Sequence, residues 1–354
     1  MKWKFYSLAF VAGMSILTAC SSDDNNDNDG NGGNGNGNEI ENGTILKGTI
    51  TSDVTLAAGN TYKLSGEYIV EEGATLHIEE GVKIIAVYDD IADYILVKQG
   101  GKINAVGTPD KPIVMTSEKE ESGAWGGIHI CGRAHTNAEG GKGSSEIGGA
   151  VYGGNDDADN SGTLQYIRLE YTGFAFDEEH EANGISFYGV GNGTIVDHCQ
   201  AYKGSDDGFE FFGGSVNVSN LVAVSCSDDS FDWTEGWNGK GTNLVAYQEA
   251  ESTLGYDCDC LMECDNNGSN NAATPVAHPV LKNLILVGNG GSKQGIRLRA
   301  GTEVEIDNAK ICGKGQPLTV ETALTENALK NGTSKLTNIT LTAELSSKEG
   351  IYTH

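Results

Sequence analysis

Two copies of one phrase, SDDGFEFFGG at residues 205–214 and SDDSFDWTEGW at residues 227–237, decide the fold class of this chain. A third copy, ANGISFYG at residues 182–189, aligns with them at offsets of 24 and 22 residues. Within each copy, apolar and polar side chains alternate, which is the pattern of a β-strand with one buried face. A repeat of this length, built from short strands, predicts a solenoid in which each repeat forms one coil and equivalent residues stack in columns.

A shorter phrase with the pattern polar-Asn-apolar-x-apolar recurs in the same register. It occurs as SNLVAV, TNLVAY, KNLILV, DNAKIC and TNITLT at residues 219–224, 242–247, 282–287, 307–312 and 337–342, while QYIRLE (165–170) and DHCQAY (197–202) fill the same slot without Asn. The shortest spacings are 22 to 25 residues, and the longer ones contain insertions. An Asn repeated at one turn predicts an inward ladder of hydrogen bonds between coils.

These repeats predict an all-β protein in which residues 44–354 form one right-handed parallel β-helix, a single solenoid of roughly ten coils. The consensus of leucine-rich repeats is absent, and the repeat is shorter than the blades of about 40 residues that build a β-propeller. The stretch ETALTENALKNG at residues 321–332 is the best helix candidate. We expect this helix to cover the C-terminal end of the solenoid against edge pairing.

The composition is that of an acidic chain. The 354 residues include 50 Asp and Glu but only 23 Lys and Arg, which gives a formal net charge of −27. Because few cationic side chains are available to neutralise phosphates, we expect no nucleic-acid partner. The 50 glycines have no three-residue period, which excludes a collagen helix.

The N-terminus resembles the signal segment of a bacterial lipoprotein. An apolar run follows two lysines and ends in Leu-Thr-Ala-Cys at residues 17–20, which resembles a lipobox. We therefore expect residues 1–19 to be a signal peptide that is removed. Cys20 is then the acylated residue that attaches the protein to the lipid bilayer.

The segment after Cys20 has the composition of a tether. Residues 21–38 read SSDDNNDNDGNGGNGNGN and contain no apolar side chain, so we expect residues 20–43 to be the lipidated cysteine and a disordered linker. Acidic residues directly after a lipidated cysteine resemble the surface-export signal of Bacteroidota lipoproteins. The expected location is therefore the outer membrane, lipid-anchored and exposed at the cell surface.

Several phrases resemble a group of secreted or lipid-anchored β-helix proteins of Gram-negative bacteria. They are GATLHIEEGVKI (73–84), GTPDKPIVMTS (107–117), GAWGGIHICGRA (123–134) and YGGNDDADNSGTLQYIRLEY (152–171), in addition to the two phrases that contain SDD. The chain also resembles, more loosely, the pectin-lyase-like superfamily. The resemblance implies the fold and the export route, and it implies no catalytic residues.

The alignment of the copies assigns each side chain to a face of its strand. Inward columns are expected to contain Ile185, Phe209 and Phe231, and then Phe187, Phe211 and Trp233. Alternation places Glu210 and Asp232 on the outer face, one coil apart, with Arg297 farther along the same column. At the preceding turn, Asp206 stacks over Asp228 and Asp207 over Asp229.

Three interpretations of these stacked carboxylates stay open. In the first, SDD is a turn signature whose side chains cap backbone N–H groups. In the second, the repulsion is relieved by a bound cation, with calcium as the expected ion and Asp206, Asp207, Asp228 and Asp229 as ligands. In the third, Glu210 and Asp232 are catalytic carboxylates, with Arg297 beside them. The chain lacks the Gly-His-Gly and Arg-Ile-Lys segments of polygalacturonase-type β-helices, which weakens the third interpretation.

A second candidate cation loop is DADNSG at residues 157–162. Asp157, Asp159 and Ser161 match the first half of a calcium loop, but its twelfth position is Arg168 and not Glu. The segment is therefore not an EF-hand. It is either a turn stabilised by Asp and Asn side chains or a calcium-binding loop.

The cysteines suggest a disulfide and not a zinc knuckle. Besides Cys20 there are seven, of which three lie in CDCLMEC at residues 258–264. The spacing C-x-C-x₃-C fits a zinc knuckle poorly. In an extracytoplasmic protein, we expect a disulfide to pin this segment, which lies in the longest insertion.

We conclude from the sequence that the chain is a surface-anchored β-helix lipoprotein that binds an extracellular ligand, with a glycan as the expected partner. Phe212 and Trp237 are candidate sugar-stacking side chains, and Arg299 is a further candidate ligand-binding residue. One alternative is a polysaccharide lyase or glycoside hydrolase that uses Glu210, Asp232 and Arg297. Another is a structural or adhesive surface protein. The sequence leaves the oligomeric state open.

Overall fold

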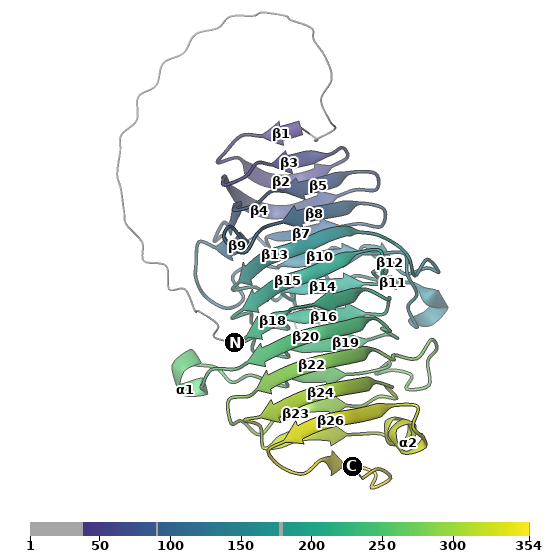
Figure 1. The fold of residues 1–354 in the computed structure, drawn as a ribbon. Coiled ribbons are helices and arrows are strands. Elements are labelled where there is room, and N and C mark those ends of the chain that lie inside the picture. Colours follow the sequence, from purple (N-terminus) through teal and green to yellow (C-terminus); the bar gives the residue numbers. More distant parts are fainter. Residues whose placement is uncertain (1–37, 90, 177–179, 354) are drawn as a thin grey trace, which may run out of the picture. The chain divides into compact units, whose positions relative to one another are not determined.

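Strands of successive coils pair in parallel throughout the computed structural model, which describes residues 38–89, 91–176 and 180–353. Hydrogen bonds connect 25 strands into one continuous sheet system, and the ladder of strands is visible in Figure 1. The predicted fold is confirmed, because this arrangement is that of a right-handed parallel β-helix with few helices.

The strand pairs follow three columns along the solenoid. The first contains β1 (Asn38–Ile40), β3 (Val54–Leu56), β5 (Thr75–Ile78), β8 (Lys102–Val106), β17 (Asn217–Ser219) and the N-terminal halves of β13 (Gly162–Glu170), β15 (Ile195–Tyr202), β20 (Lys240–Tyr247), β22 (Val280–Val287), β24 (Glu305–Cys312) and β26 (Lys335–Leu341). The second contains the C-terminal halves of those six strands, the N-terminal halves of β2 (Ile45–Ile50) and β4 (Thr61–Val70), and the strands β6 (Lys83–Ala86), β9 (Ile113–Ser117) and β18 (Val222–Val224). The third column contains the C-terminal halves of β2 and β4, followed by β7 (Tyr94–Val97), β10 (Ile128–Cys131), β14 (Ile185–Tyr188), β16 (Phe209–Phe212), β19 (Phe231–Thr234), β21 (Met262–Cys264), β23 (Gln294–Leu298), β25 (Gln316–Val320) and β27 (Ser346–Ser347).

From β13 onward, a left-handed residue other than glycine bends each coil between the first and second columns. The residues at this corner are Tyr166, His198, Asn220, Asn243, Asn283, Asn308 and Asn338, all with positive φ. Asn tolerates this backbone better than most residues, which explains the repeated Asn of the sequence. The amides form the predicted ladder, as in the 2.9 Å bond from Asn243 to Asn220. The prediction that the ladder points inward is wrong, because the bend turns these side chains outward, and Asn243 and Asn283 are exposed.

The core consists of the inward columns that the alignment predicted. Ile185 pairs with Phe209 and Phe209 with Phe231, and all three are buried. In the neighbouring column, the rings of Phe187 and Phe211 stack with centroids 5.0 Å apart. Burial of large rings in register is the main favourable term for a solenoid, because each coil covers the apolar surface of the next.

Few elements depart from the coils. A hairpin of β11 (Gly143–Ser144) and β12 (Val151–Tyr152) follows the 3₁₀ helix η1 (Glu139–Gly141), and α1 (Glu251–Leu254) lies in an insertion. The predicted C-terminal helix is confirmed as α2 (Ala323–Asn331), which ends at Gly332 in the left-handed conformation. No helix of the described residues is long and apolar enough to cross a membrane.

The solenoid begins earlier than residue 44. Strand β1 pairs with β3 through Asn38 and Ile40, which lie in the range that the sequence assigned to the tether. Ile40 is half-buried against the core, and this apolar contact supports the pairing of β1. The expected signal peptide, Cys20 and the tether up to residue 37 lie outside the described residues.

Candidate functional site

The candidate site lies on the outer face of the third column. Here Glu210 pairs with Asp232, Asp232 with Glu263, and Glu263 with Arg297. The predicted register of Glu210 over Asp232 is therefore confirmed, and Arg297 lies in the same column. Glu263 was missed by the sequence analysis because it belongs to CDCLMEC, which was interpreted as an insertion.

The turn before each of these strands contributes a second row of polar side chains. Asn183, Asp207 and Asp229 occupy equivalent positions, and each side-chain oxygen accepts the backbone N–H of the equivalent residue one coil later, at 3.1, 2.8 and 2.7 Å. The last of these N–H groups belongs to Cys260. Asp207 and Asp229 therefore cap backbone groups, as the turn-signature interpretation requires, but their second oxygens remain available for other partners.

The carboxylates converge into overlapping groups. One group contains Asp206, Asp207 and Asp228, a second contains Asp207, Glu210 and Asp232, and a third contains Asp229, Asp232 and Glu263. Within each group, one oxygen per residue lies within 4.8 Å of the others. Because the groups share members, they form one continuous acidic surface, which we call the acidic face and define by the residues of these three groups.

Cationic side chains neutralise only one end of the acidic face. Arg297 binds Glu263 at 2.8 Å, and Arg299 binds both Glu263 and Asp265. Lys293, which directly precedes β23, binds Asp259. Among the described residues, no Lys or Arg forms an ion pair with the six carboxylates of the two preceding coils, which are Asp206, Asp207, Glu210, Asp228, Asp229 and Asp232.

The electrostatic consequence is a set of carboxyl groups with raised pKa values. Burial raises the pKa of Asp206 to about 8, and the charge of Asp228 adds to the shift. The pKa values of Asp207 and Asp229 are also well above the ordinary range, first because of burial and then because of neighbouring carboxylates. The same causes raise the pKa of Glu210. The protonated forms of these groups are therefore favoured unless a cation compensates their charge.

The side chain of Asp232 gives the strongest indication that the acidic face binds a cation. Its Oδ1 atom is buried and has no hydrogen-bond partner, and Asp232 belongs to two of the carboxylate groups. An unpartnered buried carboxylate oxygen is costly, because it has lost water without gaining a donor. A cation coordinated by the acidic face would satisfy it.

A polar pocket of about 690 Å³ opens at the end of β19, next to the acidic face. Its lining includes Thr234, Glu235, Asn137, Asn267 and Ser269. Amides, hydroxyls and a carboxylate supply both donors and acceptors, which suits a ligand that is rich in hydroxyl groups.

A family model described as a pectate-lyase-like β-helix domain matches residues 48–354. The chain belongs to this family. None of the curated proteins matches it.

Two predicted stacking residues of this pectate-lyase-like β-helix domain are not exposed, so the prediction of an aromatic platform is wrong. Trp237 lies in the core, where its ring stacks on Phe211 at 4.2 Å. Phe212 points outward but is covered by the β11–β12 hairpin and stacks on Tyr188 at 4.4 Å. The third candidate, Arg299, is half-buried and engaged by two carboxylates.

The DADNSG loop makes the contacts of a turn. Asp157 Oδ1 lies 2.6 Å from Nδ1 of His135 and accepts the backbone N–H of the same residue. Asp159 accepts the hydroxyl of Ser161 at 3.3 Å, and Asn160 accepts the N–H of Gly162. These hydrogen bonds favour the turn interpretation, and a calcium site at this loop stays a prediction.

The CDCLMEC segment is a coil of this domain and not a pinned loop. Pairing of Asp232 with Glu263 aligns Cys260 with Asp229 and Asp259 with Asp228. The expected disulfide is absent, because all seven cysteines among the described residues are free thiols. Cys264 points into the core, where the repeat places an apolar side chain, and this explains why a cysteine there remains unpaired.

Proposed function

We propose that this chain is a lipid-anchored surface protein that binds an extracellular glycan at the acidic face, with a divalent cation between protein and glycan. The observation that carries this proposal is the set of six carboxylates with which no described Lys or Arg forms an ion pair, beside a polar pocket. Oxygen-only ligands favour Ca²⁺ among the common divalent ions.

The charge of the site favours an anionic glycan over a neutral one once the cation is bound. A calcium ion held by two or three carboxylates keeps open coordination positions, which a uronate carboxylate can fill. The adjacent pocket offers Glu139 and Ser269 to sugar hydroxyls. A glycan that contains uronic acids is therefore the proposed ligand class.

The proposal is tested by titrating oligouronides into the full chain by calorimetry, with Ca²⁺ and again with EDTA. We expect binding only with Ca²⁺, and strong weakening in Asp207→Asn. This variant keeps the oxygen that caps Asp229, as Asn183 does naturally one coil earlier, and removes only the charge. Equal binding with EDTA would contradict the role of the cation, and the absence of binding to any uronate or neutral glycan would favour the structural or adhesive alternative.

The register of Glu210 over Asp232 supports an enzyme as the second candidate. Two carboxyls one coil apart, with raised pKa values, match the arrangement that glycoside hydrolysis needs. Arg297 is less suited to act as a lyase base, because Glu263 and Glu321 both bind its guanidinium. We expect no release of reducing ends or unsaturated uronates. Release that is lost in Glu210→Gln and Asp232→Asn would establish catalysis.

A further inference from the structure

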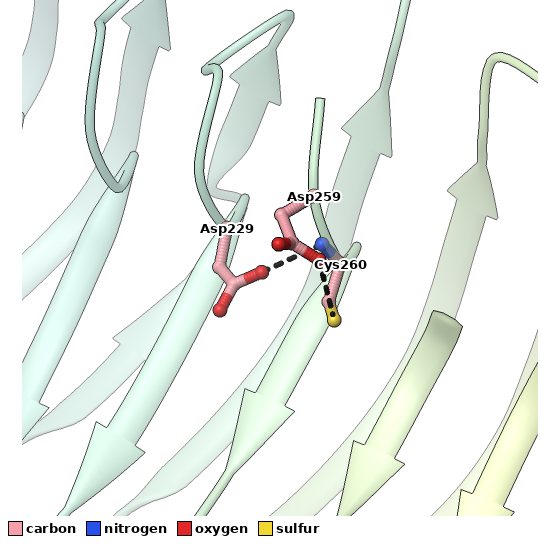
Figure 2. A group of neighbouring side chains, drawn as sticks. All are labelled: Asp229, Asp259 and Cys260. Carbon is pink, nitrogen blue, oxygen red and sulfur yellow. Dashed lines mark hydrogen bonds between the residues drawn. The ribbon is translucent and has the colours of Figure 1, made fainter. Parts of the chain in front are cut away.

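A thiol occupies the position that the two preceding coils fill with aspartate. In Figure 2, Cys260 lies opposite Asp229 of the previous coil and next to Asp259. The side chain of Cys260 is fully buried, that of Asp229 is buried, and that of Asp259 is half-buried, so the group is reached from solvent past Asp259. Sulfur here is not needed for packing in the core, because Cys260 lies in the outward polar row.

The three side chains point toward one another. Cys260 Sγ donates to Asp259 Oδ1 at 3.3 Å, and Asp229 Oδ1 accepts the Cys260 N–H at 2.7 Å. One ligand atom from each residue lies within 4.8 Å of the other two. Lys293 binds Oδ2 of Asp259, which leaves Oδ1 directed at the sulfur.

A buried and unpartnered oxygen lies beside this group. The side chain of Gln248 is 2% exposed, and its Nε2 donates to the carbonyls of Asp259 at 3.1 Å and Cys260 at 3.5 Å. These bonds hold the amide against the Asp259–Cys260 dipeptide, yet its Oε1 has no hydrogen-bond partner. A buried oxygen without a partner is thus held on a side chain that is bound to the backbone of Asp259 and Cys260.

We propose that Asp229, Asp259 and Cys260 form a binding site for a borderline divalent metal, with Zn²⁺ as the expected ion. A thiolate selects against Ca²⁺ and Mg²⁺, whereas zinc accepts sulfur and carboxylate oxygen together. On binding, Cys260 loses its proton to solvent, and the metal replaces the hydrogen bond between Sγ and Oδ1 of Asp259. Without metal, burial and the nearby carboxylates raise the pKa of the thiol, so it stays protonated.

The test uses Co²⁺ as a spectroscopic substitute for Zn²⁺, added to the reduced full chain. We expect a near-ultraviolet thiolate-to-cobalt charge-transfer band that saturates at one ion per chain and is displaced by Zn²⁺. Cys260→Ser is expected to abolish the band, and Asp259→Asn to weaken Co²⁺ binding at least tenfold. Absence of the band in the parent protein would overturn the proposal.

Cys312→Ser is the matched control, because Cys312 is more accessible than Cys260 and lies in the second column. The band is expected to persist in this variant, and its loss there, or its survival in Cys260→Ser, would overturn the assignment. Circular dichroism checks that each variant is folded. Because Cys260→Ser leaves Asp206, Asp207 and Asp228 in place, its calcium-dependent glycan binding is expected to be unchanged, so failure of the zinc site and failure of the proposed glycan function are distinguishable.

Discussion

Asn243 occupies a left-handed corner with φ of 59°, donates to Asn220 and accepts from Asn283. Substitution by valine forces a β-branched residue into this backbone, and we expect a loss of about 2 kcal/mol of stability. Glycine tolerates the backbone but removes both hydrogen bonds, so Asn243→Gly is expected to lose about 1 kcal/mol. Urea unfolding measures both, and a valine variant as stable as the parent would contradict the role of the corner.

Strand alternation predicts side-chain direction only while the strand continues. It correctly placed Glu210 and Asp232 outward, because both lie inside strands. It failed for Trp237, which follows Thr234 at the end of β19, because Glu235 and Gly236 have positive φ and turn the chain back toward the core. No property of the Trp237 residue type reveals this turn.

The coil that contains β21 is difficult to recognise from its amino-acid sequence. It lies 31 residues after the coil of β19, because an insertion with α1 precedes it, and cysteine replaces aspartate at the aligned turn position. The signal that remained was the spacing of Asp259, Met262 and Glu263, which matches that of Asp228, Phe231 and Asp232. The repeats with unbroken spacing were predictable because burial imposes the same apolar column on every coil.

Helix α2 is attached to the C-terminal segment through Glu326. Its carboxylate accepts the backbone N–H groups of Glu349, Ile351 and Tyr352. Burial raises the pKa of Glu326, but the nearby Ser347 hydroxyl and the hydrogen bonds from these backbone groups lower it more, so the net pKa is below its usual 4.5. A lowered folded pKa means that the stabilisation is present above pH 4.5 and is lost as the pH falls through the folded value.

We therefore expect Glu326→Gln to expose residues 346–352 to proteolysis at neutral pH. The neutral amide has one acceptor oxygen, whereas the carboxylate uses two charged oxygens to accept the three N–H groups. The difference between variant and parent is expected to shrink as the parent is acidified below pH 4.5. Peptide mass spectrometry after limited digestion with an acid-tolerant protease measures both effects. A difference that is constant with pH would show that the charge of Glu326 is not responsible.

At the scale of the whole molecule, attachment to the membrane depends on one residue. We expect Cys20→Ala to release the protein from the membrane fraction, because the expected tether after it contains no apolar anchor. Deletion of residues 21–29 is expected to retain the lipid but to lose exposure at the cell surface. Fractionation and protease access in intact cells are the measurements, and a Cys20→Ala protein that still requires detergent would contradict the anchor.

The charge distribution along the solenoid explains why the site lies where it does. Coils after the acidic face carry Lys293, Arg297 and Arg299, which neutralise their neighbours. The coil before it carries Asn183 and Ser186 at the aligned positions. Within this column, the carboxylates that form no ion pair with a described Lys or Arg thus lie on two coils, and a ligand that supplies positive charge there stabilises the folded state.

The most direct test of cation binding at the acidic face is the melting temperature of the EDTA-treated full chain as Ca²⁺ is added, at constant ionic strength and with Mg²⁺ as the comparison. Binding to the folded state adds about 2.7 kcal/mol at a hundredfold excess over Kd. We expect a clear rise with Ca²⁺, a much smaller rise in Asp207→Asn, and an unchanged rise in the surface control Asp110→Asn. A melting temperature that ignores Ca²⁺, or rises equally in all three proteins, would contradict the cation site.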